Sequence, residues 1–429
     1  MNGDQSLPAD FRGIIEECAH RAVEEGAEGA PESERFRVIS DEVGLFLYML
    51  ARAANRTSIS DMGGLGGASS SIVWLAGAAC RTDGEVIAWE ANPRRLLKLQ
   101  NCLSRARLAP NVELICADPL WSFEEDEGEP AQPAQHDSES LIEKVRIWEG
   151  LDTLDAGSDM SVASLVEPDW NLRMARAWDL LEPEGIFVLT DTLLAGESTE
   201  ARIGDFFGPR PAATVSFPLG EGVLVAYKLP DETLSGARDD SMILGGQAHE
   251  VLEDLQTRNR KPGSRLWAIP PETGRFLWII IRSMAAKRVL EIGASGGYSG
   301  TWIAKALETS GGTLTTMDLD PDKVALARET YSRAGVADRV EIIPGDARDI
   351  VPTLEGQYDL VFLDCDKEFY LDLLEPILWR LRRGGLLIAD NVLSHGELLK
   401  SYVDEVQHHP SLASLTLPIG SGEEMTMVL

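Results

Sequence analysis

The sequence has little positive charge for its length. It contains 39 Lys and Arg against 70 Asp and Glu, for a formal net charge of −31. Nucleic acids and anionic membranes are bound through clustered basic side chains, so this balance argues against both kinds of partner. No run of residues is long and apolar enough to span a bilayer, and the first residues lack a basic-then-apolar signal pattern. We therefore expect a cytoplasmic protein that binds neither nucleic acid nor membrane.

Cysteine is also scarce. The chain has 5 cysteines, scattered along its 429 residues and without the paired Cys or His spacing of a zinc site. This pattern predicts reduced thiols rather than a disulfide framework. Length and a hydrophobic content of 44% are typical of a soluble protein with two or three domains.

The chain repeats itself, which predicts two tandem domains of one fold. Four residues around 63–69 match four residues around 293–299 without a gap: Gly63, Gly66, Gly67 and Ser69 match Gly293, Gly296, Gly297 and Ser299. We expect a first domain at 1–229, a linker at 230–240 and a second domain at 241–429. The first domain carries an acidic insert at about 121–157 that the second lacks, and its composition predicts disorder.

A glycine-rich turn lies at the centre of the second domain. Val289–Ile292 has the pattern of a buried strand, residues 293–297 are all small, and Tyr298–Leu307 has the pattern of a helix. Strand, glycine turn and helix form the first unit of a nucleotide-binding α/β sheet. Asp318 follows the next strand, where an acid can hold two ribose hydroxyls. A generic α/β turn without a ligand is the alternative.

Strands and helices alternate through the second half, which predicts a mostly parallel sheet with helices on both faces. The expected strands after the glycine turn are Leu314–Met317, Val340–Ile343, Leu360–Leu363, Leu386–Ala389 and Met425–Val428. The expected helices include Ser241–Arg258, Glu272–Met284, Pro321–Ala334 and Leu371–Leu381. Ligands of such sheets bind at the carboxyl ends of the strands.

Polar residues cluster at two of these strand ends. Asp364 follows Leu360–Leu363, and Asp390 and Asn391 follow Leu386–Ala389. Oxygen ligands of this kind suit a hard cation such as Mg²⁺, and no His or Cys joins them to suggest zinc. The alternative is that these acids only cap helices or turns.

The motifs VLEIGASGGYSG, DLDPDK, GDARDIVP, FLDCDKEFY and LIADN carry a family resemblance. Residues 263–429 resemble the cation-dependent, S-adenosylmethionine-dependent class I O-methyltransferases, the caffeoyl-CoA and catechol O-methyltransferase group. The resemblance implies a Rossmann-like class I methyltransferase sheet with a reversed last hairpin, a methyl-donor site, a divalent metal site and a small catechol-like or hydroxylated aromatic acceptor. With the internal repeat, it makes the fold class two tandem domains of this type.

The resemblance also assigns roles by position. It places eight residues around S-adenosylmethionine: Glu291, Gly293, Ala294, Ser299, Asp318, Asp346, Ala347 and Asp366. It makes Asp364, Asp390 and Asn391 the ligands of Mg²⁺ or another divalent cation, and Lys367 the general base, with Asp364 beside it in the catalytic site. A bound cation lowers the pKa of an acceptor hydroxyl, and Lys367 can accept the proton if burial and the cation depress its own pKa.

The first half keeps the fold signals and loses this chemistry. Ser164, Glu167 and Thr192 stand where Asp364, Lys367 and Asn391 stand in the second half, and of the metal set Asp191 alone remains. The first half therefore looks like a degenerate, structural or regulatory copy. Relatives of the second half commonly form homodimers, so we expect the two halves to form an internal pseudo-dimer; a homo-oligomer is also open.

Two other functions are consistent with parts of the pattern. One is a catalytically silent binding or regulatory protein. The other is an NAD-linked dehydrogenase, against which the turn reads G-A-S-G-G rather than G-x-G-x-x-G and the metal trio has no role. The chain also departs from the family at Trp267 and at Glu423 and Glu424, where relatives usually have other residue types.

Overall fold

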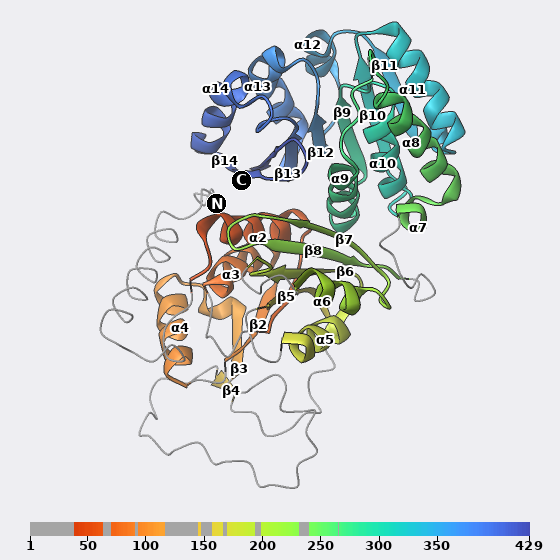
Figure 1. The fold of residues 1–429 in the computed structure, drawn as a ribbon. Helices are drawn as coiled ribbons and strands as arrows, with labels where there is room; N and C mark the ends of the chain where they lie inside the picture. Colours follow the sequence, from red (N-terminus) through yellow and green to blue (C-terminus); the bar gives the residue numbers. More distant parts are fainter. Residues whose placement is uncertain are drawn as a thin grey trace. The chain divides into compact units, whose positions relative to one another are not determined.

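The computed structural model describes residues 38–62, 70–90, 93–115, 145–146, 157–165, 170–193, 199–230, 240–264 and 266–429. Most of the acidic insert, nearly all of the expected linker and the glycine turn of the first half lie outside the described residues. The described chain contains two sheets, both flanked by helices (Figure 1).

The first sheet has the strand order β4-β3-β2-β1-β5-β6-β8-β7. Its strands are β1 (Ser58–Asp61), β2 (Glu85–Trp89), β3 (Val112–Ile115), β4 (Val145–Arg146), β5 (Ser158–Ser164), β6 (Leu181–Thr190), β7 (Ala212–Phe217) and β8 (Val223–Lys228). The accompanying helices are α2 (Asp41–Ala53), α3 (Ser71–Thr82), α4 (Pro93–Arg105), α5 (Trp170–Leu180) and α6 (Thr199–Phe207). Strands β1 to β6 pair in parallel, and β7 and β8 are antiparallel.

The second sheet has the order β11-β10-β9-β12-β13-β15-β14. Its strands are β9 (Arg288–Ile292), β10 (Thr313–Asp318), β11 (Val340–Pro344), β12 (Tyr358–Leu363), β13 (Leu381–Ala389), β14 (Leu412–Leu417) and β15 (Glu423–Val428). Strand β15 is antiparallel to both β13 and β14, which confirms the reversed last hairpin. The other pairings are parallel.

Two groups of helices cover the two faces of this second sheet (Figure 1). One group is α8 (Gly246–Asn259), α9 (Pro271–Ser283), α10 (Tyr298–Leu307) and α11 (Pro321–Arg333). The other is α12 (Ala347–Ile350), α13 (Tyr370–Arg380) and α14 (Gly396–His408). Between α13, α14 and the sheet lies a core of buried residues that includes Leu290, Val361, Tyr370 and Leu387.

Apart from the edge strand β4, the first sheet repeats the strand order of the second. The expectation of two tandem Rossmann-like α/β domains is therefore confirmed. Shared order brings the same chain positions to the carboxyl edge of each sheet, which allows the two edges to be compared residue by residue.

One expected helix is interrupted in the structure. Ser241–Arg258 was expected to be a single helix, but the structure has α7 (Asp240–Leu244) and then α8. The break falls at Gly245, whose φ of 79° is not helical. Glycine reaches this conformation without steric cost, so the apolar spacing on either side could not reveal the break. Among the described helices, none is long and apolar enough to cross a membrane.

Candidate active site

The glycine turn between β9 and α10 lets two strand ends approach each other closely. Gly293 has a φ of 110°, and a Cβ at that position would lie 2.0 Å from the backbone oxygen of Asp364. No side chain fits there, and the conformation itself is one that L-residues rarely adopt. The turn thereby places bare backbone of β9 directly against the loop that follows β12.

Glu291 lies beneath this turn rather than at its surface. Its side chain is fully buried, and its two oxygens accept hydrogen bonds from the hydroxyls of Ser299 and Thr316, both at 2.5 Å. Burial raises the pKa of Glu291 to about 7. In this arrangement Glu291 connects β9, β10 and α10.

Asp318 ends β10 with both carboxylate oxygens held in place. Oδ2 accepts a hydrogen bond from the Ser295 amide at 2.8 Å, and Oδ1 accepts one from the Asp320 amide at 2.9 Å. Each oxygen keeps capacity for another donor, because an ionised carboxylate offers about four acceptor positions. The carboxylate is therefore oriented in advance for a ligand that donates two hydroxyls.

A cavity of about 290 Å³ opens beside Asp318 at the carboxyl edge of the second sheet. Among its lining residues are six positions that the sequence singled out: Gly293, Asp318, Asp346, Ala347, Asp364 and Asp366. Ala294 and Ser299 lie instead at a smaller neighbouring pocket, and Glu291 lines neither. The cavity thus brings most of the expected cofactor residues together with one expected metal ligand.

Five other lining residues were not among the site residues expected from the sequence. Trp267, Leu319, Lys323, Arg348 and Phe369 also face the cavity. Trp267 is 70% exposed and Leu319 is 65% exposed, an unusual state for large apolar side chains at a polar edge. Leu319 directly follows Asp318, and this adjacency was the available signal.

Two residues that line the cavity, Asp346 and Arg348, form an ion pair. The Arg348 Nη2 atom lies 2.6 Å from Asp346 Oδ2, and its guanidinium stacks on the Phe369 ring at 3.8 Å. The hydrogen bond from Arg348 lowers the pKa of Asp346. The pair gives the cavity a flat guanidinium and aromatic surface.

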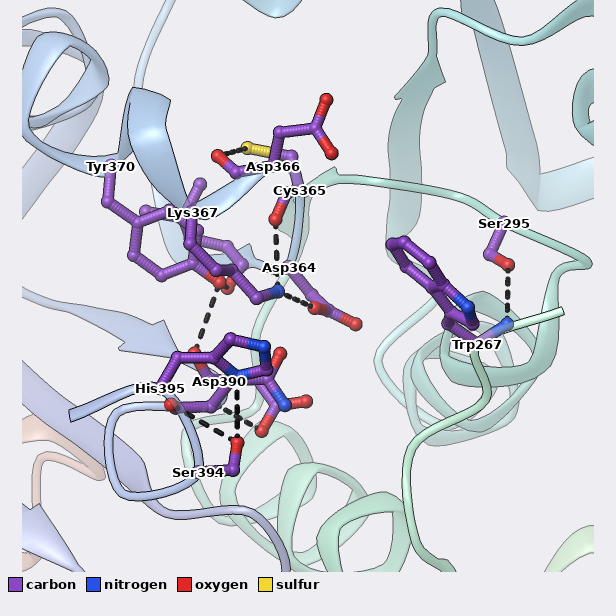
Figure 2. A network of polar contacts seen from close by, with 12 residues as sticks. Trp267, Ser295, Asp364, Cys365, Asp366, Lys367, Tyr370, Asp390, Ser394 and His395 are labelled. Atoms are coloured by element: carbon purple, nitrogen blue, oxygen red, sulfur yellow. Dashed lines mark hydrogen bonds and ion pairs between the residues drawn. The ribbon is translucent and has the colours of Figure 1, made fainter. Parts of the chain in front are cut away.

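Lys367 reaches Asp364, one of the residues that line the cavity (Figure 2). The Lys367 ammonium donates to Asp364 Oδ1 at 2.7 Å and to the Cys365 carbonyl at 2.9 Å. The Tyr370 hydroxyl lies 3.0 Å from the Leu363 carbonyl and 3.1 Å from the Asp390 carbonyl, at the ends of β12 and β13. These contacts fix the positions of Asp364, Lys367 and the ends of β12 and β13 relative to one another.

Asp390 is 2% exposed, and its Oδ1 accepts a hydrogen bond from the Asn391 amide at 2.5 Å. Burial, followed by the negative charge of Asp364, raises the pKa of Asp390 to about 7. Two acids that disfavour each other's charge in a buried site suit a divalent cation, so the expected ligands fit one. Within the described ranges, no group of three or more His, Cys, Asp or Glu side chains is arranged to hold a metal ion. The expected set has two carboxylates and one amide, and its role stays a prediction.

Two further residues near this site, His395 and Glu423, differ in their burial. His395, which matched no expected role, is exposed and shares a hydrogen bond with Ser394 (Figure 2). Glu423 is completely buried and accepts a hydrogen bond from the hydroxyl of Thr273 at 3.1 Å. Its sequence signal was the pair of acids, Glu423 and Glu424, at the start of β15.

In the first half, Glu90 follows β2 at the position where Asp318 ends β10 in the second half. The Glu90 carboxylate is already paired with an arginine of the same chain. Arg95 donates to Glu90 through Nε at 3.1 Å and Nη2 at 2.8 Å, and both side chains are at most 2% exposed. At the other strand end, Asp191 accepts hydrogen bonds from the hydroxyls of Ser164 and Thr190. An internal arginine and two hydroxyls thus satisfy the acids that a cofactor or cation would need.

We expect Arg95→Met to lower the free energy of unfolding by about 3–5 kcal/mol, because it removes the buried guanidinium that donates two hydrogen bonds to the Glu90 carboxylate. Denaturation followed by circular dichroism measures the loss, and hydrogen exchange at β2 localises it. The double variant Glu90→Gln with Arg95→Met should recover most of the stability. A loss below 1 kcal/mol in the single variant would contradict the importance of the pair.

Comparison with known proteins identifies the family of this site. The family model described as O-methyltransferase matches residues 243–422. The caffeoyl-CoA O-methyltransferase of Populus kitakamiensis is 32% identical over 165 residues, which are 37% of this chain and 70% of the relative. The chain belongs to the O-methyltransferase family. This membership favours a methyltransferase over the dehydrogenase alternative for the second half, residues 241–429, which we call the O-methyltransferase half from here on.

Other relatives match over a smaller share of their length. The catechol O-methyltransferase of Mycobacterium tuberculosis is 40% identical over 133 residues, 31% of this chain and 60% of the relative. A crystal structure of the O-methyltransferase from Bacillus cereus in complex with SAH is 26% identical, with a TM-score of 0.39, and the match covers 43% of this chain and 91% of that chain. The O-methyltransferase half thus aligns with about three-fifths of the catechol enzyme.

Proposed function

We propose that the O-methyltransferase half transfers a methyl group from S-adenosylmethionine to a hydroxyl of a small catechol-like acceptor, with a divalent cation held by Asp364, Asp390 and Asn391. The observation that carries this proposal is the continuity of the cavity. It runs from Asp318, oriented for ribose hydroxyls, to Asp364 of the expected metal set. A single cavity is therefore lined both by Asp318, which we assign to the cofactor, and by Asp364, which we assign to the cation.

The described residues suit the ribose and the adenine of the cofactor. Asp318 accepts the ribose hydroxyls, and Gly293 lets the ligand lie against bare backbone. Leu319 and the Arg348–Phe369 stack offer flat surfaces for the adenine. S-adenosylmethionine supplies the methyl group on a sulfonium, which makes it reactive toward an oxygen nucleophile.

At the acceptor end, a divalent cation supplies the Lewis acidity that lowers the pKa of a bound hydroxyl. Asp364 and Asp390 provide the negative charge and the oxygen ligands for it. In this proposal Lys367 receives the hydroxyl proton at Nζ, and the contact with Asp364 holds that atom at the site. The chain's own contribution to the rate is positioning and the exclusion of water.

Titration of the metal-loaded full chain with S-adenosylmethionine should give one binding site per chain. The O-methyltransferase half offers Asp318, whereas Arg95 occupies the corresponding Glu90 in the first half. Calorimetry reads the stoichiometry without any assumption about the acceptor. Two sites would contradict the proposal that the first half is a degenerate copy.

The same preparation tests transfer. With catechol as acceptor and S-adenosylmethionine labelled in its methyl group, we expect a labelled methyl ether in the presence of Mg²⁺ and none after removal of the cation with EDTA. Restoring Mg²⁺ should restore the product. Cofactor binding without transfer to any catechol or hydroxycinnamoyl acceptor would favour the catalytically silent alternative. The internal pseudo-dimer and the choice of cation stay predictions.

A further inference from the structure

Helix α9 is apolar on all of its sides. Residues 276–281 at its centre are six consecutive apolar residues, and each of them is at most 2% exposed. A helix that lies on one face of a sheet needs one apolar side, whereas a helix that is apolar all round must be covered on its other sides too. Helix α10 packs along one side, where the Trp302 indole lies against Gly274. The remaining sides of α9 therefore need a further cover.

The hairpin β7–β8 covers another side of α9. It lies at the edge of the first sheet, but residues 198–429, which include it and the whole O-methyltransferase half, belong to one compact unit of the chain. Tyr227 of β8 packs edge-to-face on Trp278, with the ring centres 5.5 Å apart. Phe217 of β7 packs in the same manner on Phe276 at 6.3 Å. All four rings are buried, so this contact excludes water.

Two arginines of α9 add contacts to the same interface. The Arg282 guanidinium lies 4.9 Å from the ring centre of Trp278 and 5.3 Å from that of Tyr227. Arg275 donates to the backbone carbonyl of Thr214 in β7 at 3.4 Å. A cation over two aromatic rings and a hydrogen bond to a strand give the contact a defined geometry in addition to its apolar area. The hairpin is therefore a specific partner for α9.

The first turn of α9 packs against the turn that joins β14 to β15. The Thr273 hydroxyl donates to Glu423 Oε1 at 3.1 Å, and both side chains are fully buried. Gly420 lies so close to Thr273 that a Cβ at that position would collide with the threonine hydroxyl. The position of α9 thus sets the position of this turn.

The same turn holds the loop that follows β13. Three consecutive loop amides donate at 3.0–3.2 Å to two carbonyls of the turn: Val392 to Gly422, and Leu393 and Ser394 to Ser421. The loop begins at Asn391, which we assign to the cation, so it belongs to the acceptor end of the site. Direct contacts therefore lead from the hairpin, through α9 and the turn, to this loop.

We propose that the hairpin β7–β8 is an intrachain partner of the methyltransferase site: it fixes α9, and through the first turn of α9 it positions the loop at residues 391–395 for the acceptor. This inference rests on the proposed function where it assigns the loop to the acceptor. It gives the first half a role even though the acids at its own strand ends are already paired. Contiguous packing and hydrogen bonds of this kind can carry coupling between distant positions.

The test is hydrogen exchange of the full chain without cofactor or cation, read at the amides of Val392, Leu393 and Ser394. Tyr227→Ala removes the ring that packs on Trp278. We expect exchange at the three loop amides to become about tenfold faster, because the turn that accepts their hydrogen bonds is less firmly held. Exchange in β9 and β10 should stay within about twofold, since these strands are held by their own pairing.

Kinetics of the same variant show whether the loop serves the acceptor. The KM for catechol should rise about tenfold in Tyr227→Ala. The dissociation constant for S-adenosylmethionine should stay within about threefold, because amides outside this loop, those of Ser295 and Asp320, hold Asp318.

Two further variants of β8 separate positioning from general stability. Tyr227→Phe keeps the ring on Trp278 and loses a hydroxyl that accepts from Arg282 at 3.4 Å, so its loop exchange should match that of the unmodified protein. Leu224→Ala is the matched control, because Leu224 is also buried and alternation along the strand points it to the other face of the hairpin. We expect Leu224→Ala to lower the melting temperature without faster exchange at the loop.

Unchanged loop exchange in a folded Tyr227→Ala chain overturns the inference, as does an equal increase in Leu224→Ala. An unchanged KM for catechol alongside faster loop exchange also overturns it, since the loop would then not serve the acceptor. If Tyr227→Ala does not fold, Phe217→Leu replaces it, because leucine keeps much of the apolar volume and loses the ring contact with Phe276; unchanged exchange there overturns the inference. Absence of methyl transfer by the unmodified chain would contradict the proposed function alone, because the exchange measurement needs neither acceptor nor cation.

Discussion

Lys367→Ala is expected to lower kcat for methyl transfer to catechol by about 10²–10⁴-fold, the usual contribution of a positioned general base. The Lys367 nitrogen lies 2.7 Å from Asp364, where it can receive the proton of an acceptor bound at the neighbouring cation. Alanine removes that nitrogen and leaves the backbone of the loop in place. Steady-state kinetics with catechol and Mg²⁺ measures the loss.

Binding measurements separate this effect from damage to the site. The Lys367→Ala chain should bind S-adenosylmethionine within about threefold of the unmodified protein, because Lys367 does not line the cofactor cavity. Lys400→Ala is a suitable control, since Lys400 pairs with Asp404 on the exposed face of α14. A kcat within fivefold of the unmodified value would assign proton transfer to another group.

Asp318→Ala is expected to weaken S-adenosylmethionine binding by about 10²-fold or more. Each hydrogen bond from a ribose hydroxyl to an ionised carboxylate is worth about 1.5–3 kcal/mol, and two of them are lost. The amides of Ser295 and Asp320 also lose their acceptor, so the turn that forms the cavity becomes less well ordered. Calorimetric titration gives the dissociation constant directly.

The conservative variant Asp318→Asn distinguishes lost charge from lost shape. It keeps the size of the side chain and one acceptor oxygen, so we expect an affinity between those of the unmodified protein and Asp318→Ala. Asp322→Asn, an exposed position in the first turn of α11, should have no effect. Undiminished affinity in Asp318→Ala would remove Asp318 from the cofactor site.

The fold of the O-methyltransferase half was largely predictable because its strands are short apolar runs separated by turn residues. Helix α10 begins and ends at the expected residues, Tyr298–Leu307. Helix α13 and strand β13 differ from expectation mainly at their ends, where the end of one directly meets the start of the other. The break at Gly245 was missed because hydrophobic spacing continues on both sides of it.

The sites at strand ends were predictable for a related reason. Parallel strands bring their carboxyl ends to one edge, so Asp318, Asp364 and Asp390 could be placed at that edge from chain order alone. The pairing of side chains could not be predicted this way. Arg95 lies only five residues from Glu90, yet nothing in the spacing shows that the pair is buried.

The sequence by itself determined the tandem α/β architecture, the glycine turn at Gly293 and the acids at the strand ends, because these follow from local periodicity and chain order. Only the tertiary structure decided which acids face a cavity and which are enclosed. Asp318 opens onto the cavity, Glu291 is closed off by two hydroxyls, and Glu423 is buried and accepts a hydrogen bond from Thr273. Burial and hydrogen bonding depend on residues distant in the chain, such as Thr273 for Glu423, so local periodicity and chain order could not reveal them.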